Sequence, residues 1–187
     1  DIGVQDSIDE ADQQQGLFAL NARGLTITNC VFGSHRGDAI DVAGIDVRDV
    51  EITDCWIGVM PDQPGKPYPT GETGIRVGGS RISVHENVIA GCRTGMSAQG
   101  DSISITANVI GIVHNGVVYS TRSSGVVLGR GSSISIGDLT KDFSGNQIIG
   151  TGSSGISCFT TEPIDGIVIA RNLIGFDVVN SAVRPCG

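Results

Sequence analysis

The sequence predicts an all-β solenoid, a parallel β-helix, on the evidence of three columns of repeated short segments. In the first column an apolar residue is followed by two polar residues, then Asn or Cys, then an apolar pair and a small residue. Its copies begin at Ile27, Ile52, Val84, Ile105 and Ile169, with a looser copy at 146–150. Because self-similarity of this kind is the signature of repeat architectures, it decides the fold before any local motif.

The other two columns lie between these copies. The second reads Gly-Ile-Arg-Val at 74–77 and Gly-Met-Ser-Ala at 95–98, and the third reads Ile-Ser-Val at 82–84 and Ile-Ser-Ile at 103–105. Period-two alternation rich in Ile and Val and punctuated by Gly and Ser is typical of half-buried strands. Three short strands per repeat of roughly 20–30 residues fit a coil that adds one strand to each of three stacked sheets.

Short and long coils alternate along the chain. After Gly33, Ala90 and Ile149 the next strand follows quickly, whereas after Gly58 and Gly111 long excursions intervene. We therefore expect about six coils in three long/short pairs. They would form a single domain over residues 1–187, in which 1–15 and 176–187 are partial long excursions.

Composition limits the possible partners. The chain has 28 Gly and only 4% aromatic residues, so turns and small stacked residues predominate. A net charge of −8 without a basic stripe argues against nucleic acid or an anionic membrane surface as the main partner. There is no transmembrane run. Neither a Cys/His metal spacing nor a phosphate-binding Gly loop is present, so no metal or cofactor is expected.

The repeat resembles the right-handed parallel β-helices of large bacterial secreted and cell-surface proteins. The residues that carry the resemblance are Asn-x-Ile-Gly, a long polar insertion, Gly-Ile-x-Val and a second Asn-x-Ile, and they cover nearly the whole chain. The resemblance implies a right-handed coil, a location outside the cell or at its surface, and frequent contact with polysaccharide. It is weak for function, because this fold hosts pectin and alginate enzymes, adhesins and phage tailspikes alike.

The Asn column predicts a structural ladder. Equivalent residues of a parallel stack lie ~4.8 Å apart, so an inward-facing Asn can donate its amide to the side-chain carbonyl of the next one. The expected ladder residues, with two Cys in the same column, are Cys30, Cys55, Asn87, Asn108, Asn146 and Asn172. One strand step lies within the ~4.4–6.8 Å Cα range of a disulfide, so Cys30 and Cys55 either form a bridge or stack as free thiols. Five Cys leave one unpaired or paired between chains, and Cys186 is the candidate.

The strongest catalytic candidates are His35, Asp38 and Asp41, on a turn and the strand after it. Two carboxylates and a His on one face could act as acid and base in glycoside cleavage. The competing interpretation makes Asp38 a turn-capping residue and Asp41 an exposed partner of Arg76. Because the paired-Asp motifs of pectinases and the clustered basic residues of lyases are missing, catalysis is the less favoured function.

The long excursions are the preferred place for binding, because insertions in a solenoid map to one edge and often form its binding face. An aromatic residue with polar and basic neighbours suits a sugar or a protein partner. It is equally possible that the two Tyr only pin their own loops. The binding-face candidates are Lys66, Tyr68, His114, Tyr119, Arg122 and Arg184.

The preferred function is a non-catalytic structural or interaction module outside the cell. A β-helix ends in open strand edges, so copies of the chain could stack end to end into filaments. The chain could instead be part of a larger surface adhesin. The expected partners are the chain itself, flanking coils of a longer array, or polysaccharide. The alternative function is a carbohydrate-active β-helix, either a lyase or hydrolase or tailspike-like.

Overall fold

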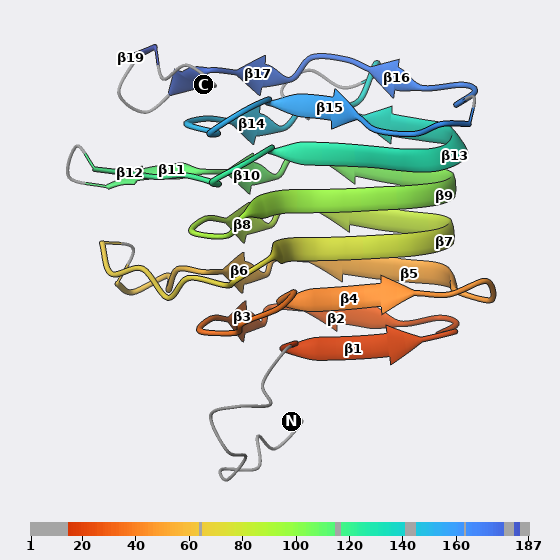
Figure 1. Cartoon of the computed structure of the whole chain (residues 1–187), viewed down its shortest axis with the longest axis horizontal. Helices are drawn as coiled ribbons and strands as arrows, with labels where there is room; N and C mark the ends of the chain where they lie inside the picture. Colours follow the sequence, from red (N-terminus) through yellow and green to blue (C-terminus); the bar gives the residue numbers. More distant parts are fainter. Residues whose placement is uncertain are drawn as a thin grey trace, which may run out of the picture.

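The computed structural model describes residues 15–63, 65–114, 117–140, 145–162, 164–177 and 182–183. In these residues every regular element is a strand, and the strands stack coil upon coil into a parallel β-helix (Figure 1). The fold class and the six coils predicted from the repeat are confirmed, because each of the two large sheets contains six strands that follow one another from coil to coil.

The coils build two sheets, and one of them bends to form two faces of the solenoid. The first face holds β1 (Leu17–Leu20), β4 (Ile40–Ala43), β7 (Thr73–His85), β9 (Thr94–Thr106), β13 (Val126–Ile136) and β15 (Ile156–Cys158). The second face adds β2 (Thr26–Thr28), β5 (Arg48–Thr53) and β16 (Val168–Ile169). The separate sheet holds β3 (Val31–Phe32), β6 (Trp56–Ile57), β8 (Val88–Ile89), β10 (Val109–Ile110), β14 (Gln147–Ile148) and β17 (Leu173–Ile174).

Three strands run round the corner between the first two faces without a break. The sequence predicted two separate strands there, but β7, β9 and β13 are continuous. They bend at Gly79, Gly100 and Gly131, which pair in register with φ angles of 151°, 122° and 154°. A Cβ at Gly100 would lie 2.0 Å from the carbonyl oxygen of Gly79, and a Cβ at Gly131 would lie 2.0 Å from that of Gly100. Only glycine lets the backbones stack this closely.

The core consists of in-register columns of aliphatic side chains. One column runs from Ile27 through Ile52, Val84, Ile105 and Ile136 to Ile169. A second runs from Phe32 through Ile57, Ile89, Ile110 and Ile148 to Ile174. Each residue packs on its equivalents one coil before and after, so the repeat seen in the sequence is the repeat of the core.

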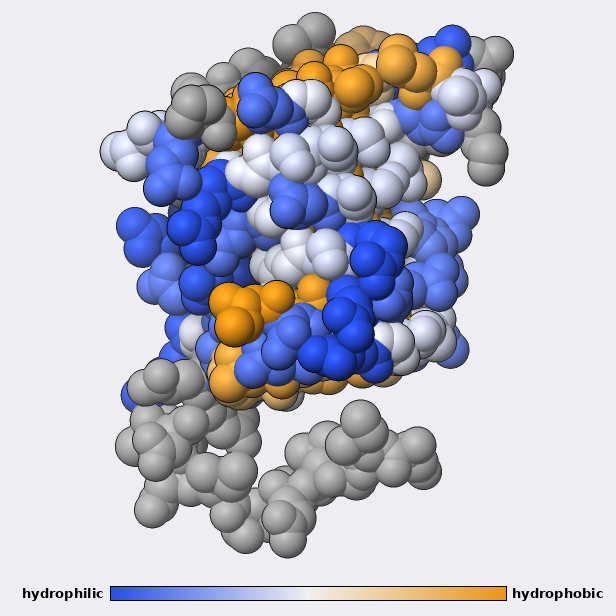
Figure 2. Space-filling view, turned by 90° about the vertical axis from the view of Figure 1, so that its right-hand side faces the viewer, coloured by the Kyte–Doolittle hydropathy of each residue, from blue (hydrophilic) through white to orange (hydrophobic). Residues whose placement is uncertain are grey.

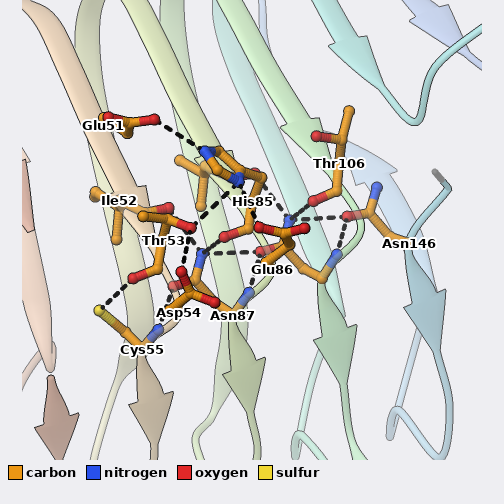
Figure 3. A network of polar contacts seen from close by, with 12 residues as sticks. Glu51, Ile52, Thr53, Asp54, Cys55, His85, Glu86, Asn87, Thr106 and Asn146 are labelled. Carbon is orange, nitrogen blue, oxygen red and sulfur yellow. Dashed lines mark hydrogen bonds and ion pairs between the residues drawn. The ribbon is translucent and has the colours of Figure 1, made fainter. Parts of the chain in front are cut away.

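The asparagines form a continuous buried ladder, part of which Figure 3 shows. The Asn87 amide donates to Asn108 Oδ1 at 2.9 Å, that of Asn108 to Asn146 Oδ1 at 2.9 Å, and that of Asn146 to Asn172 Oδ1 at 2.8 Å. The amides of Asn87 and Asn108 also donate to the carbonyl two residues earlier in the chain and to one in the preceding coil. The ladder therefore holds the turn between the second face and the separate sheet at the same geometry in successive coils.

The thiol of Cys55 occupies a ladder position and repeats the asparagine contacts. Its Sγ donates to the carbonyl of Thr53, two residues earlier, at 3.2 Å and to that of Ile27, in the preceding coil, at 3.8 Å. The disulfide considered between Cys30 and Cys55 is not formed, because both are free thiols. A thiol that points at backbone carbonyls serves the turn as the Asn amide does, and a bridge would remove that donor.

The long excursions leave the solenoid on one side as antiparallel pairs, which Figure 1 draws at its left. The first is closed by a bridge between Val59 and Pro67. The second is the hairpin of β11 (Ile112–His114) and β12 (Val117–Tyr119), and the third pairs β18 (Phe176–Asp177) with β19 (Ala182–Val183). They occur on alternate coils, so the predicted long/short alternation is present.

Candidate functional site

Polar side chains cluster on and before β4. Asp41 pairs in register with Arg76, as the sequence predicted. The Nη1 atom of Arg76 lies 3.7 Å from Asp41 Oδ2 and 3.9 Å from Asp38 Oδ2. Asp38 Oδ1 also accepts a 2.8 Å hydrogen bond from the backbone N–H of Thr73, so Asp38 caps a turn of the next coil. One guanidinium thus faces two carboxylates.

Asp41 is not the exposed residue that the sequence predicted: it is only 3% exposed. Strand alternation does turn it outward, but Nε2 of Gln15 donates to its Oδ2 at 3.1 Å. Its other oxygen, Oδ1, is buried and has no hydrogen-bond partner among the described residues. The backbone beside Gln15 also covers His35, because a Cβ at Gly16 would lie 2.6 Å from His35 Nε2. Alternation predicts the direction of a side chain but not which residues cover it.

Burial changes the acid–base properties of this cluster. It raises the pKa of Asp41, Arg76 opposes that rise, and the Asp38 carboxylate adds to it. Burial also lowers the pKa of His35, whose buried Nδ1 contacts no hydrogen-bond partner within the part of the chain that the structure describes. A carboxyl whose pKa is raised by burial, close to an imidazole whose pKa is lowered by burial, is the kind of perturbed pair from which acid–base catalysis draws its groups. A substrate would have to displace Gln15 to reach Asp41.

A second polar network surrounds His85 on the second face (Figure 3). His85 Nε2 lies 3.1 Å from Glu51 Oε1, and Nδ1 lies 3.3 Å from Glu86 Oε2 and 3.2 Å from Thr53 Oγ1. In the part of the chain that the structure describes, no group of three or more His, Cys, Asp or Glu side chains could hold a metal ion. The network is therefore best described as cross-strand pairing on a polar face.

The binding-face candidates of the excursions are only partly brought together. Lys66 Nζ lies 5.2 Å from the centre of the Tyr68 ring, and the Tyr119 hydroxyl donates to the carbonyl of Gly65 at 2.6 Å. Tyr119 thus fastens the second excursion to the first one, rather than only pinning its own loop. Arg122 is exposed on the approach to β13. The side chain of His114 and the whole of Arg184 and Cys186 lie outside the described residues.

A groove runs along the corner where β7, β9 and β13 bend. We call it the corner groove; it is a cavity of about 630 Å³ lined by Gly44, Ile45, Gly78, Gly79, Ser80, Gln99, Gly100, Asp101, Arg130, Gly131 and Glu162. A second cavity of about 570 Å³ shares Gln99, Arg130 and Glu162 with it and extends it toward Phe159. Residues of intermediate hydropathy, drawn pale, occupy the middle of this side of the molecule between hydrophilic flanks (Figure 2).

Residues 4–174 match the family model of the right-handed β-helix region. The chain belongs to the right-handed β-helix family. Neither the curated proteins nor the solved structures gave a match. No helix among the described residues is long and apolar enough to cross a membrane.

The corner groove of this right-handed β-helix was not predicted, although the sequence carries a signal for it. Gly-Gly-Ser at 78–80, Gln-Gly-Asp at 99–101 and Gly-Arg-Gly-Ser at 129–132 follow the second column at nearly the same position in three successive coils. Each is an ordinary turn signal by itself. Their recurrence in register, with an extra residue in the third coil, indicates a corner at which glycines stack on one another.

Proposed function

We propose that this chain is a non-catalytic structural and interaction module of a longer β-helical stack outside the cell. The observation that carries the proposal is the state of the core columns in the last coil. Ile169 and Ile174 are 50% and 46% exposed, whereas Ile105 and Ile110, two coils earlier in the same columns, are fully buried. Aliphatic side chains that continue a buried column are best covered by another coil.

The first coil supports the same proposal. Leu25 and Phe32 belong to its inner face but are only partly buried. An end-on contact between the last coil of one copy and the first coil of another would cover both sets. Because this contact uses two different surfaces, it is heterologous and gives open filaments rather than closed rings.

Analytical ultracentrifugation of the unmodified 187-residue chain and of two lysine variants tests this proposal. We expect the unmodified chain to associate as its concentration rises and Ile174→Lys to remain monomeric, because an end-on contact would bury that charge without a partner. Leu139→Lys, which adds the same charge at an exposed position after β13, should associate like the unmodified chain. An unmodified chain that stays monomeric at every concentration would contradict the proposal.

The location outside the cell rests on the resemblance of the repeat to secreted and cell-surface β-helices. Protease treatment of intact source cells tests it. An extracellular module is digested or released while a cytoplasmic marker stays intact, and protection of the chain together with that marker would contradict this part of the proposal.

Catalysis on a carbohydrate is the second candidate function, and the raised pKa and unpaired Oδ1 of Asp41 favour it. Reducing ends or unsaturated products released from pectin, alginate or neutral glycans would reveal it. Release that is lost in both Asp38→Asn and Asp41→Asn would establish this function over the non-catalytic one. Absence of release from all of these polymers would argue against it.

A further inference from the structure

We propose that the last coil selects its neighbour through Asn172, and that the neighbour it fits best is a β-helical coil with asparagine at the ladder position. This inference rests on the proposed stacking and deepens it, because it names the kind of coil that the C-terminal end of the stack accepts. The site is incomplete without that neighbour, since the acceptor for Asn172 must come from the next coil.

The rungs of the asparagine ladder share one direction. The backbone N–H at a ladder position donates to the side-chain oxygen of the ladder residue one coil later. Asn108 donates to Asn146 Oδ1 at 3.0 Å, and Asn146 donates to Asn172 Oδ1 at 2.9 Å. Even Cys55, which has no amide side chain of its own, donates its N–H to Asn87 Oδ1 at 3.0 Å. Each of these donors therefore finds its acceptor in the coil that follows.

Asn172 is the last rung among the described residues. Its Oδ1 accepts from Asn146, and its amide donates to the carbonyls of Ile136 at 2.8 Å and Ala170 at 3.1 Å. Within the part of the chain that the structure describes, its backbone N–H has no hydrogen-bond acceptor, and no side-chain oxygen of a following coil receives its amide. Asn172 is also half-buried, whereas the three ladder asparagines before it are fully buried. This rung therefore lacks the acceptor that every earlier asparagine has.

The first coil of another copy offers sulfur instead of oxygen. Cys30 occupies its ladder position, because the strands on either side of Cys30 pair in register with those on either side of Cys55. Its Sγ donates to the carbonyl of Thr28, two residues earlier, at 3.3 Å, as a ladder amide does. A thiol sulfur is a weak acceptor, whereas a carboxamide oxygen has two lone pairs and can receive both donors of Asn172. A junction between identical copies thus contains the weaker rung.

The other contacts of the junction do not distinguish the two neighbours. Ile169 and Ile174 lie in the columns that begin at Ile27 and Phe32, so another copy continues both columns. The last coil carries the excursion of β18 and β19 and the first coil is a short one, so stacked copies also keep the long/short alternation. Burial of apolar surface is non-directional, so it holds either neighbour. Selection is left to the ladder, whose donors have fixed directions.

Sedimentation equilibrium of variants at Cys30 tests the proposal, because this position meets Asn172 when copies stack. Cys30→Asn supplies the missing oxygen, and the matched control Cys30→Ala removes the thiol without supplying one. We expect Cys30→Asn to associate about tenfold more tightly than the unmodified chain, and Cys30→Ala to associate no more tightly than it. Cys55→Asn, which places the same side chain one coil inside the junction, should leave the association unchanged. In the Ile174→Lys background the gain from Cys30→Asn should vanish.

Two results would overturn the inference. They are association of Cys30→Asn that is no tighter than that of Cys30→Ala, and a gain that persists in the Ile174→Lys background. In either case, association of the unmodified chain that Ile174→Lys abolishes would still support the proposed stack. The reverse outcome, an unmodified chain that stays monomeric while Cys30→Asn associates, would support selection at Asn172 and contradict the stacking of identical copies.

Discussion

The side-chain oxygen of Asn108 accepts two hydrogen bonds from Asn87, one from its amide at 2.9 Å and one from its backbone N–H at 3.0 Å. Both residues are fully buried. One side-chain oxygen therefore accepts from both the backbone N–H and the side-chain amide of the asparagine in the preceding coil. The same pair of hydrogen bonds recurs between Asn108 and Asn146 and between Asn146 and Asn172. Buried groups of this kind are costly when they lose a partner.

Asn108→Leu should strongly destabilise the chain. The change leaves the backbone N–H and the amide of Asn87 without Oδ1 and removes the donor to the carbonyls of Val84 and Thr106. Each unsatisfied buried group costs about 1–3 kcal/mol, so we expect a total loss of about 3 kcal/mol or more. Urea unfolding followed by far-ultraviolet circular dichroism measures it. A loss below about 1 kcal/mol would contradict a structural ladder.

Cys55→Asn should be tolerated, unlike the previous change. The carbonyls of Thr53 and Ile27 already accept from the Cys55 thiol. They are equivalent, one coil earlier, to the carbonyls that accept from the Asn87 amide. Cys55→Leu at the same position removes the donor and is the matched control. We expect the unfolding free energy of Cys55→Asn to equal or exceed that of the unmodified chain, with Cys55→Leu below both. The reverse order would show that the thiol is needed for its size alone.

Asp41→Asn should stabilise the chain by an amount that grows with pH. Because burial raises the folded-state pKa of Asp41 above 3.8, the folded state binds more protons than the unfolded state in the window just above that value. Stability is therefore lost as pH rises through the folded pKa. The Asn variant escapes that loss, so its advantage should be smallest near pH 3 and largest near neutrality. Urea titrations at several pH values check the sign, and an advantage that shrinks as pH rises would contradict the buried carboxyl.

Alkylation should distinguish the cysteines in the folded chain. Cys158 is exposed, whereas burial raises the pKa of the fully buried Cys92 to about 12 and also raises the pKa of Cys55. Because the thiolate is the reactive form, iodoacetamide at pH 8 should label Cys158 first and reach Cys55 and Cys92 only in urea. Peptide mass spectrometry gives the order. Equal labelling of Cys92 and Cys158 before unfolding would contradict the burial of Cys92.

The sequence predicted the parts of the structure that recur. The Asn column, the core columns and the alternation of coils each repeat at equivalent positions, and a stack of coils converts such a repeat directly into contacts between neighbours. The pairing of Asp41 with Arg76 followed from the same register. Repetition along the chain was sufficient for all of these.

The features that the sequence missed depend on residues outside the repeat or on space between coils. Burial of Asp41 depends on Gln15, which precedes the first coil and belongs to no column. The continuous corner strands depend on how closely Gly79 and Gly100 stack, and the corner groove is lined by the same two glycines. Neither closeness nor empty space is a property of a single segment.

Electron microscopy of the concentrated chain tests the stacking proposal most directly. We expect unbranched rods in which the coils continue from copy to copy, with an axial spacing of ~4.8 Å that marks uninterrupted parallel strands. Ile174→Lys should give short single particles under the same conditions. Single six-coil particles of the unmodified chain at every concentration, with Ile169 and Ile174 left facing solvent, would contradict the proposal that this chain is a module of a longer β-helical stack.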